Sequence, residues 1–125
     1  MIIAALVSTI ILAILSIFQI ALALGAPIGQ FAWGGQHKVL PPNLRVGSVL
    51  SIIIYFGIAT CLLSKSSLYQ ITPQGTLLDV LVWIIFAYLV LGILMNAISR
   101  SEPERYTMTP TAIILAGCVF IIALA

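Results

Sequence analysis

The chain has 125 residues, of which 62% are hydrophobic and 6% charged, and its mean hydropathy is +1.27. Soluble domains carry about 25% charged residues, so this composition excludes a water-soluble globular fold and indicates that lipid is the solvent. The formal net charge of +2 is too small for the basic surface of a nucleic-acid-binding protein. We therefore expect no nucleic-acid partner.

Four apolar runs are long enough to cross a bilayer, whose hydrocarbon core of about 30 Å needs roughly 20 helical residues. They cover residues 2–24, 46–63, 77–98 and 111–125. The first run lacks a basic leader and is longer than the apolar part of a signal peptide, so we expect it to remain as a membrane helix. The sequence predicts an all-α fold: a single integral membrane domain that forms a membrane-embedded four-helix bundle.

Local signals mark the ends of these runs. Gly25, followed two residues later by proline, predicts a helix C-terminus, because glycine adopts positive φ and proline cannot continue a helix. Thr76 and Asp79 have the spacing of a capping box at the start of the third helix. Thr109 before Pro110 predicts the start of the fourth helix, with proline at its first position.

Basic residues set the predicted orientation, because Lys and Arg in short loops favour the cytoplasmic side. The first and third connections carry four basic residues, whereas the second carries one, Lys65. The four are Lys38, Arg45, Arg100 and Arg105. We therefore expect the first and third loops in the cytoplasm and both termini outside.

Polar residues within the apolar runs indicate a shared interior, since such side chains usually face other helices rather than lipid. They are Gln19, Tyr55, Tyr88 and Asn96. Two interpretations remain open, namely hydrogen bonds between helices and the lining of a ligand cavity. Small residues repeat along the first and last runs, which would allow close helix contacts and also a homo-oligomer.

The cysteines and several aromatic residues fit the membrane setting without indicating a site. Cys61 and Cys118 lie in apolar runs and lack CxxC spacing, as expected of small buried side chains. Zinc needs three or four protein ligands, so the single histidine predicts no metal site, and the sequence identifies no cofactor. Tyr69, Trp83 and Tyr106 lie near predicted helix ends, where we expect them to act as interfacial anchors.

Residues 25–45, called segment 25–45 below, are longer than the 2–8 residues that usually connect bundled helices. Glycines permit tight turns and prolines stiffen the chain, so we expect an ordered Gly/Pro-rich loop. Backbone N–H groups of the pair Gly34 and Gly35, together with nearby positive charges, would suit an anionic lipid headgroup. The alternative interpretation is a solvated loop without a ligand, whose charges only determine the orientation of the chain in the membrane. The candidate ligand-binding residues are Trp33, Gly34, Gly35, His37, Lys38 and Arg45.

The pattern G-A-P-x-G-x-x-A-W-G-G-x-H-x-V-L-P-x-x-L-R, from Gly25 to Arg45, resembles small uncharacterised bacterial four-helix membrane proteins. The resemblance covers segment 25–45 and extends to the rest of the chain only by hydropathy. It implies four helices and a bacterial cytoplasmic membrane, and it implies no reaction, cofactor or ligand.

Three classes of function follow from these features. We favour a non-catalytic membrane protein that binds a lipid, an anionic group or a partner subunit through segment 25–45. A small oligomeric transporter or channel is the alternative, although Glu102 and Glu104 fall in the predicted third loop and no acidic residue lies deep in a span. A second alternative is a membrane enzyme acting on a lipid or isoprenoid-like substrate, with His37 as acid or base and one of these glutamates as its partner.

Overall fold

The computed structural model describes residues 1–68 and 71–125, and these residues form an all-α structure. Within them the chain forms four α-helices, each long and apolar enough to cross a membrane, namely α1 (Ile2–Ala23), α2 (Pro42–Lys65), α3 (Thr76–Ala97) and α4 (Glu102–Ala123). Segment 25–45 adds two short 3-10 helices, η1 (Gly29–Phe31) and η2 (Trp33–Gly35). The all-α prediction is confirmed, and the length and composition of the helices suggest an integral membrane protein.

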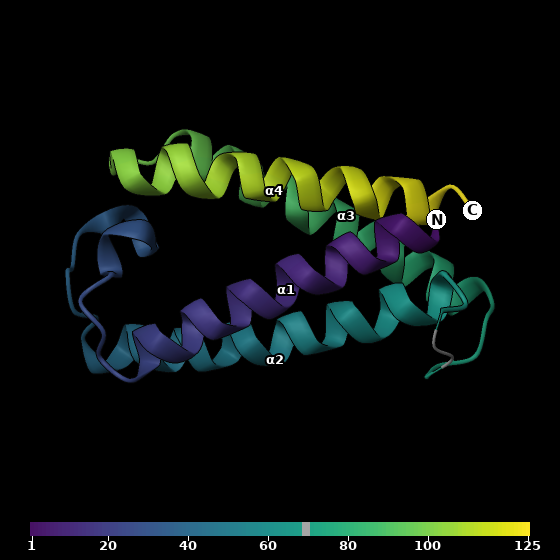
Figure 1. Ribbon diagram of the computed structural model, residues 1–125, viewed down its shortest axis with the longest axis horizontal. Helices are drawn as coiled ribbons and strands as arrows, with labels where there is room; N and C mark the ends of the chain where they lie inside the picture. The colour runs from purple at the N-terminus through teal and green to yellow at the C-terminus, as the bar shows by residue number, and fades with distance from the viewer. Residues whose placement is uncertain (69–70) are drawn as a thin grey trace.

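The helices run antiparallel in chain order (Figure 1). α1 packs most closely against α2, and α3 against α4, while α1 also contacts α4. Both termini and the α2–α3 connection lie at one end of the bundle (Figure 1). Segment 25–45 and the α3–α4 connection lie at the other end, so the two connections that carry most of the basic residues share one end.

The tightest core lies at the end that carries the termini, which we call the packed end. Ala5, Leu62, Val82, Val119 and Ile122 have no exposed surface there. These residues come from all of the helices described above. A small side chain such as alanine lets helix backbones approach closely, which is the main source of helix association in lipid.

Segment 25–45 begins with a regular helix stop at Gly25, which has φ +92°. The Gly25 N–H donates to the Leu22 carbonyl at 3.1 Å, and the Ala26 N–H donates to the Ala21 carbonyl at 3.0 Å. These two bonds form a Schellman motif, whose left-handed residue is usually glycine. The predicted end of the first helix therefore has the expected physical cause.

Beyond this stop the segment folds back between the α1–α2 pair and α4 (Figure 1). The Gly29 N–H donates to the Lys38 carbonyl at 2.8 Å and so closes the loop. Leu22, Ala32 and Leu40 are buried together beneath it. The loop thus has a small apolar core of its own.

The predicted start of the fourth helix at Thr109 and Pro110 is wrong, because α4 begins at Glu102 and Pro110 lies inside it. Ser101 is the N-cap, and its Oγ accepts a hydrogen bond from the Glu104 N–H at 3.5 Å. The Ser101-x-x-Glu104 spacing is itself a capping box with proline in the first turn. Hydropathy assigned this polar first turn to a loop, and therefore placed both glutamates outside the helix.

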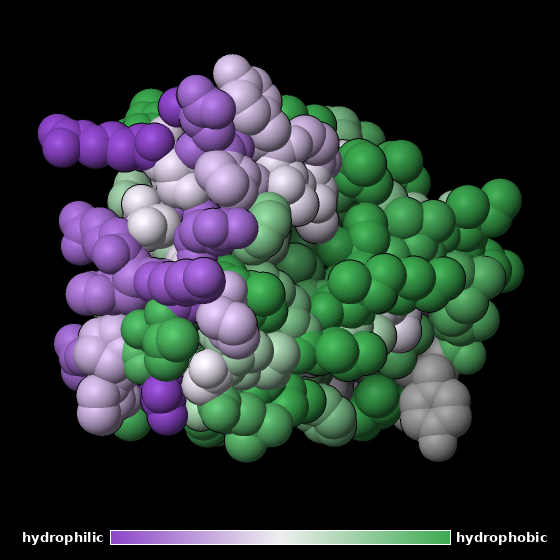
Figure 2. Space-filling view, turned by 60° about the vertical axis from the view of Figure 1, so that its left-hand side comes forward, coloured by the Kyte–Doolittle hydropathy of each residue, from purple (hydrophilic) through white to green (hydrophobic). Residues whose placement is uncertain are grey.

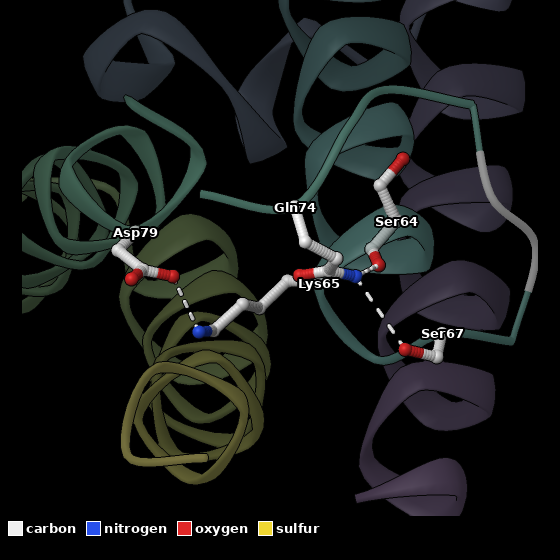
Figure 3. Close-up of polar contacts among 5 residues, drawn as sticks. All are labelled: Ser64, Lys65, Ser67, Gln74 and Asp79. Atoms are coloured by element: carbon white, nitrogen blue, oxygen red, sulfur yellow. Dashed lines mark hydrogen bonds and ion pairs between the residues drawn. The ribbon is translucent and has the colours of Figure 1, made fainter. Parts of the chain in front are cut away.

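The predicted capping box at Thr76 is also wrong, because Gly75 is the N-cap and no side chain caps α3. Asp79 instead forms an ion pair with Lys65, with 2.5 Å between Oδ1 and Nζ (Figure 3). The pair joins the last residue of α2 to the first turn of α3. α2 itself starts earlier than predicted, at Pro42, since proline suits the first turn of a helix.

The α2–α3 connection is held by side-chain bonds to its backbone. The Ser64 Oγ accepts hydrogen bonds from the N–H groups of Ile71 and Thr72 at 3.1 and 2.9 Å. The Gln74 side-chain amide donates to the Ser64 carbonyl (Figure 3). Tyr69, which the sequence predicts to be an anchor, lies outside the described residues.

The two other predicted anchors are exposed, Trp83 at 41% and Tyr106 at 69%. The Trp83 ring also packs edge-on against the rings of Phe86 and Phe120, at 5.9 Å between centroids in both cases. Trp83 therefore helps to join α3 to α4, and the interfacial role of both residues stays a prediction.

Hydrophilic residues gather at the end formed by segment 25–45 and the α3–α4 connection, whereas apolar side chains cover the flanks of the helices (Figure 2). The exposed polar residues at this end include Gln30, Gln36, His37, Lys38, Asn43, Arg100 and Glu102. This division suits a bundle whose flanks face lipid and whose end faces water.

Candidate functional site

A cavity of about 230 Å³ lies inside the bundle, between the packed end and segment 25–45. Each helix contributes to its wall, and segment 25–45 contributes a further part. We call this cavity the chamber. Its polar and aromatic wall residues are Phe18, Gln19, Phe31, Trp33, Ser51, Tyr55, Tyr88, Asn96, Glu104 and Thr111.

The polar residues that the sequence predicts to share an interior, Gln19, Tyr55, Tyr88 and Asn96, all line the chamber. Gln19 is only 8% exposed, and within the described part of the chain its Oε1 has no hydrogen-bond partner. Since an unpaired buried acceptor costs about 1–3 kcal/mol, this oxygen is suited to a donor on a ligand. Tyr88 is 49% exposed, so the chamber is not closed off at α3.

Glu104, which the sequence places in the third loop as a possible partner of His37, instead lies in α4 and lines the chamber. Its side chain is buried, at 7% exposure, and reaches the chamber from the first turn of α4. Its carboxylate accepts a hydrogen bond from the Ser99 Oγ at 2.8 Å, and that oxygen in turn accepts one from the Ser101 N–H at 3.2 Å. The nearby Arg105 pairs with the exposed Glu102 and not with Glu104, with 4.0 Å between the Arg105 Nη2 and the Glu102 Oε1. The capping-box spacing at Ser101 was the signal that locates Glu104 in a helix.

Trp33 places segment 25–45 against the chamber. Its φ of +53° is unusual for a residue with a side chain, which indicates that its surroundings hold it in place. Its ring lies over Gly47 of α2, where an added Cβ would be only 2.9 Å from the ring. Together with Phe31 and Ala32, Trp33 closes the chamber at the hydrophilic end.

Gly35 joins segment 25–45 to the start of α4. It has φ +72°, and an added Cβ would lie 2.3 Å from the Ser101 Cβ. The Ser101 Oγ donates to the Gln30 carbonyl at 2.5 Å. We call this contact the loop–α4 contact, and it keeps the loop fixed beside the chamber.

The glycine pair of the predicted anion site lies outside the chamber. Gly34 and Gly35 border a separate open hollow of about 400 Å³, together with Gln36, Arg100 and Ser101. The Gly35 N–H already donates to the Ala32 carbonyl at 2.8 Å. The positive charge at this hollow comes from Arg100, which the sequence analysis used only for orientation.

The remaining predicted loop residues are spread apart. The Arg45 Nε donates to the Leu40 carbonyl at 2.8 Å, so it supports the loop backbone. His37 and Lys38 are exposed. Glu104 is buried beside the chamber, and among the described residues no hydrogen bond joins it to His37. The pairing of His37 with Glu102 or Glu104 in the enzyme hypothesis therefore stays a prediction, as does the loop ligand site.

To a ligand, the chamber offers oxygen atoms that accept hydrogen bonds, hydroxyl groups and aromatic rings. Among the described residues, no group of three His, Cys, Asp or Glu side chains lies close enough to hold a metal ion. Cys61 and Cys118 are free thiols, and both are partly buried.

An apolar groove of about 450 Å³ adjoins the chamber, and we call it the α1–α4 groove. Its walls are almost entirely apolar and come from α1, α4 and segment 25–45. It shares five wall residues with the chamber, namely Leu15, Phe18, Phe31, Met108 and Thr111. A compartment with several polar groups in its wall therefore lies directly beside an almost entirely apolar one.

The resemblance of segment 25–45 to small bacterial membrane proteins stays an expectation. Comparison of the chain with models of protein families, with curated proteins and with solved structures finds no match.

Proposed function

We propose that the chain is a non-catalytic integral membrane protein that binds a lipid-like amphiphile, with segment 25–45 closing the binding site. The observation that carries this proposal is the wall that the chamber, with its several polar groups, shares with the apolar α1–α4 groove. A ligand with its head in the chamber and its hydrocarbon chain in the groove would satisfy both compartments. Concave, mostly apolar sites of a few hundred Å³ with a few polar groups are typical of small-molecule binding.

The proposal includes an orientation in a bacterial cytoplasmic membrane. Lys38 and Arg45 lie in segment 25–45, and Arg100 and Arg105 lie in or just after the α3–α4 connection. We expect this end of the bundle, which is hydrophilic in Figure 2, to face the cytoplasm. Lys65, at the opposite end, is paired with Asp79. The exposed Lys38 and the hollow beside Arg100 would then meet anionic lipid headgroups at the inner leaflet.

Filling the chamber tests the proposal. Gly92 lines the chamber and Gly57 does not, and an added Cβ at either position meets no atom within 4 Å. Gly92→Leu should therefore occupy the chamber, whereas Gly57→Leu is a matched change on another helix. Both are made in a Trp83→Phe background, so that Trp33 is the single tryptophan and reports on the chamber wall.

Decanamide, a neutral ten-carbon amphiphile, is titrated into each protein in detergent micelles while Trp33 emission is recorded. We expect a saturable change in the Trp83→Phe protein and in its Gly57→Leu derivative. In Gly92→Leu the affinity should fall at least about ten-fold, or about 1.4 kcal/mol. Equal affinity in the two leucine variants would contradict the proposal.

A transporter remains the second candidate, because Glu104 is a buried carboxylate beside a cavity. Ionisable residues inside membrane bundles commonly mark ion or substrate pathways. If the chain transports, proteoliposomes should take up a fluorescent lipophilic amine faster than protein-free vesicles. This uptake should be lost in Asn96→Ala and in Glu104→Gln. A chain that only binds should show no uptake above the vesicles alone.

A further inference from the structure

The chamber also indicates what kind of head the ligand carries. Resting on the proposed function, we infer that this head is a cation, a protonated amine or alkylammonium group on an apolar chain. Three features of the chamber converge on this chemistry, namely a buried carboxylate, an unpartnered amide oxygen and several aromatic rings. Each feature comes from a different part of the chain.

The charge of the chamber wall is negative. Glu104 is 7% exposed and contributes a carboxylate, and among the described wall residues there is no Lys, Arg or His. A hydrogen bond from Ser99 supports the carboxylate but does not neutralise it. A buried charge without a partner of opposite sign is costly. A cationic head would offset this cost, whereas a phosphate or carboxylate head would add a like charge.

The acceptor on the facing helix selects for the same group. Gln19 on α1 is 8% exposed, lines the chamber, and holds an Oε1 that lacks a hydrogen-bond partner within residues 1–68 and 71–125. An ammonium head carries several N–H donors and no acceptor. It could therefore serve as a donor to Gln19 or to Glu104, both of which line the chamber. An anionic head has only acceptors and would leave the amide oxygen unpaired.

Aromatic rings supply the third feature. Trp33, Tyr55 and Tyr88 line the chamber together with Phe18 and Phe31. The face of an aromatic ring carries negative potential and attracts ammonium groups, most strongly when water is excluded. Aromatic ring faces beside a carboxylate attract an alkylammonium head, whereas the same carboxylate repels an anionic one.

A structural role for Glu104 has to be separated from this ligand role, because Glu104 is also the third residue of α4 and has capping-box spacing from Ser101. Glutamine occupies the same position in capping boxes and can accept the same hydrogen bond. Glu104→Gln therefore removes the charge and keeps the cap. Glu102→Gln is the matched control, since it removes one charge from the same helical turn at a side chain that is 76% exposed.

The test uses three probes with a matched chain, decylammonium, decanamide and decanoate, and reads Trp33 emission in the full-length Trp83→Phe protein. We expect decylammonium to bind at least about ten-fold more tightly than decanamide, and decanoate to bind most weakly. In Glu104→Gln the affinity for decylammonium should fall to that for decanamide, while decanamide binding is unchanged. In Glu102→Gln the order and the spacing of the three affinities should persist.

The outcomes separate the two proposals. If decanamide binds in the chamber but decylammonium shows no preference, or keeps its preference in Glu104→Gln, the cation inference is wrong and the proposed function stands. If decanamide binding is also insensitive to Gly92→Leu, the proposed function itself fails. Loss of decanamide binding in Glu104→Gln would show that this residue acts only through the fold, and would overturn the inference.

The cationic head could belong to a membrane lipid or to a free amphiphilic amine. Repeating the decylammonium titration in nanodiscs of phosphatidylglycerol, whose head carries no ammonium group, with and without phosphatidylethanolamine, distinguishes these sources. Competition by phosphatidylethanolamine would support the cation inference with a lipid amine as the source. Unchanged tight binding of decylammonium would support it with a free amine as the source.

Discussion

The two ends of the bundle are built from the same apolar helices but are filled differently. At the packed end, Ala5, Val82 and Val119 are fully buried and the helices meet directly. At the hydrophilic end, segment 25–45 lies between the α1–α2 pair and α4, and the chamber remains inside. Lipid is as apolar as leucine, so helix contact depends on packing rather than on the hydrophobic effect. Space is therefore preserved where a loop prevents the helices from closing.

The connections at the two ends differ in the same way. The α2–α3 connection is bonded to the end of its own helix through Ser64. Segment 25–45 instead reaches across the bundle, where Gly35 and Gln30 contact Ser101 at the start of α4. The first arrangement leaves the packed end undisturbed, and the second sets the distance between helices around the chamber.

The largest effect should come from breaking the loop–α4 contact with Gly35→Ala. The new Cβ would overlap the Ser101 Cβ, and the backbone at φ +72° disfavours any side chain. We expect a loss of about 2–4 kcal/mol in the free energy of unfolding, measured by SDS titration in mixed micelles. Gly34→Ala is the control, since its φ is +77° but its added Cβ meets nothing within 4 Å.

Gly34→Ala should therefore cost only the backbone strain, about 1 kcal/mol. The difference between the two alanine variants measures the loop–α4 contact itself. If both variants lose the same free energy, the contact does not hold the hydrophilic end together.

Added volume should separate the two ends next. Ala5→Leu puts three carbons into the packed end, at a position with no exposed surface, and should cost about 1–3 kcal/mol. Ala112→Leu makes the same change at the chamber wall, where space is open, and should change stability by less than about 0.5 kcal/mol. Thermal unfolding in one detergent compares the two. A similar penalty at both sites would mean that the chamber is already closed to a side chain.

Hydropathy and the positions of polar residues in the sequence predict much of the fold and part of the candidate site. The runs of apolar residues predicted the helices, and Gly25 marked the end of α1 through a Schellman motif. Tyr55 and Asn96 were predicted to face inward because polar side chains avoid lipid, and both line the chamber. These features depend on local chemistry, which the sequence displays directly.

The position of Glu104 could not be obtained in the same way. A polar first turn and an internal Pro110 made the start of α4 look like a loop. Capping-box spacing occurs twice in the sequence, at Thr76 and Asp79 and at Ser101 and Glu104. The first match does not form a cap, because Gly75 is the N-cap of α3, whereas Ser101 caps α4. Spacing alone cannot choose between two matches, because the cap that forms depends on tertiary contacts such as that between Ser101 and Gln30.

At the packed end, Ser64→Ala should release the α2–α3 connection. The buried Ser64 hydroxyl accepts from two backbone N–H groups, and their loss should cost about 1–2 kcal/mol. Ser67→Ala is the control, since its exposed hydroxyl accepts one 3.4 Å bond, and should cost less than about 0.5 kcal/mol. Hydrogen exchange of the Ile71 amide should accelerate only in Ser64→Ala. Unchanged exchange there would contradict the assigned role of Ser64.

The smallest effect should come from the ion pair between Lys65 and Asp79. The sequence predicts a capping role for Asp79 and does not predict this ion pair. The Lys65 side chain is 11% exposed and that of Asp79 is 50% exposed, so water screens the pair from one side. A double-mutant cycle with Lys65→Met and Asp79→Asn should give a coupling of about 0.5 kcal/mol, reduced by added salt. A coupling of several kcal/mol that is insensitive to salt would place the pair in hydrocarbon instead of water. The boundary of the membrane would then lie beyond the α2–α3 connection. The whole packed end would then lie in hydrocarbon, up to the ends of its helices.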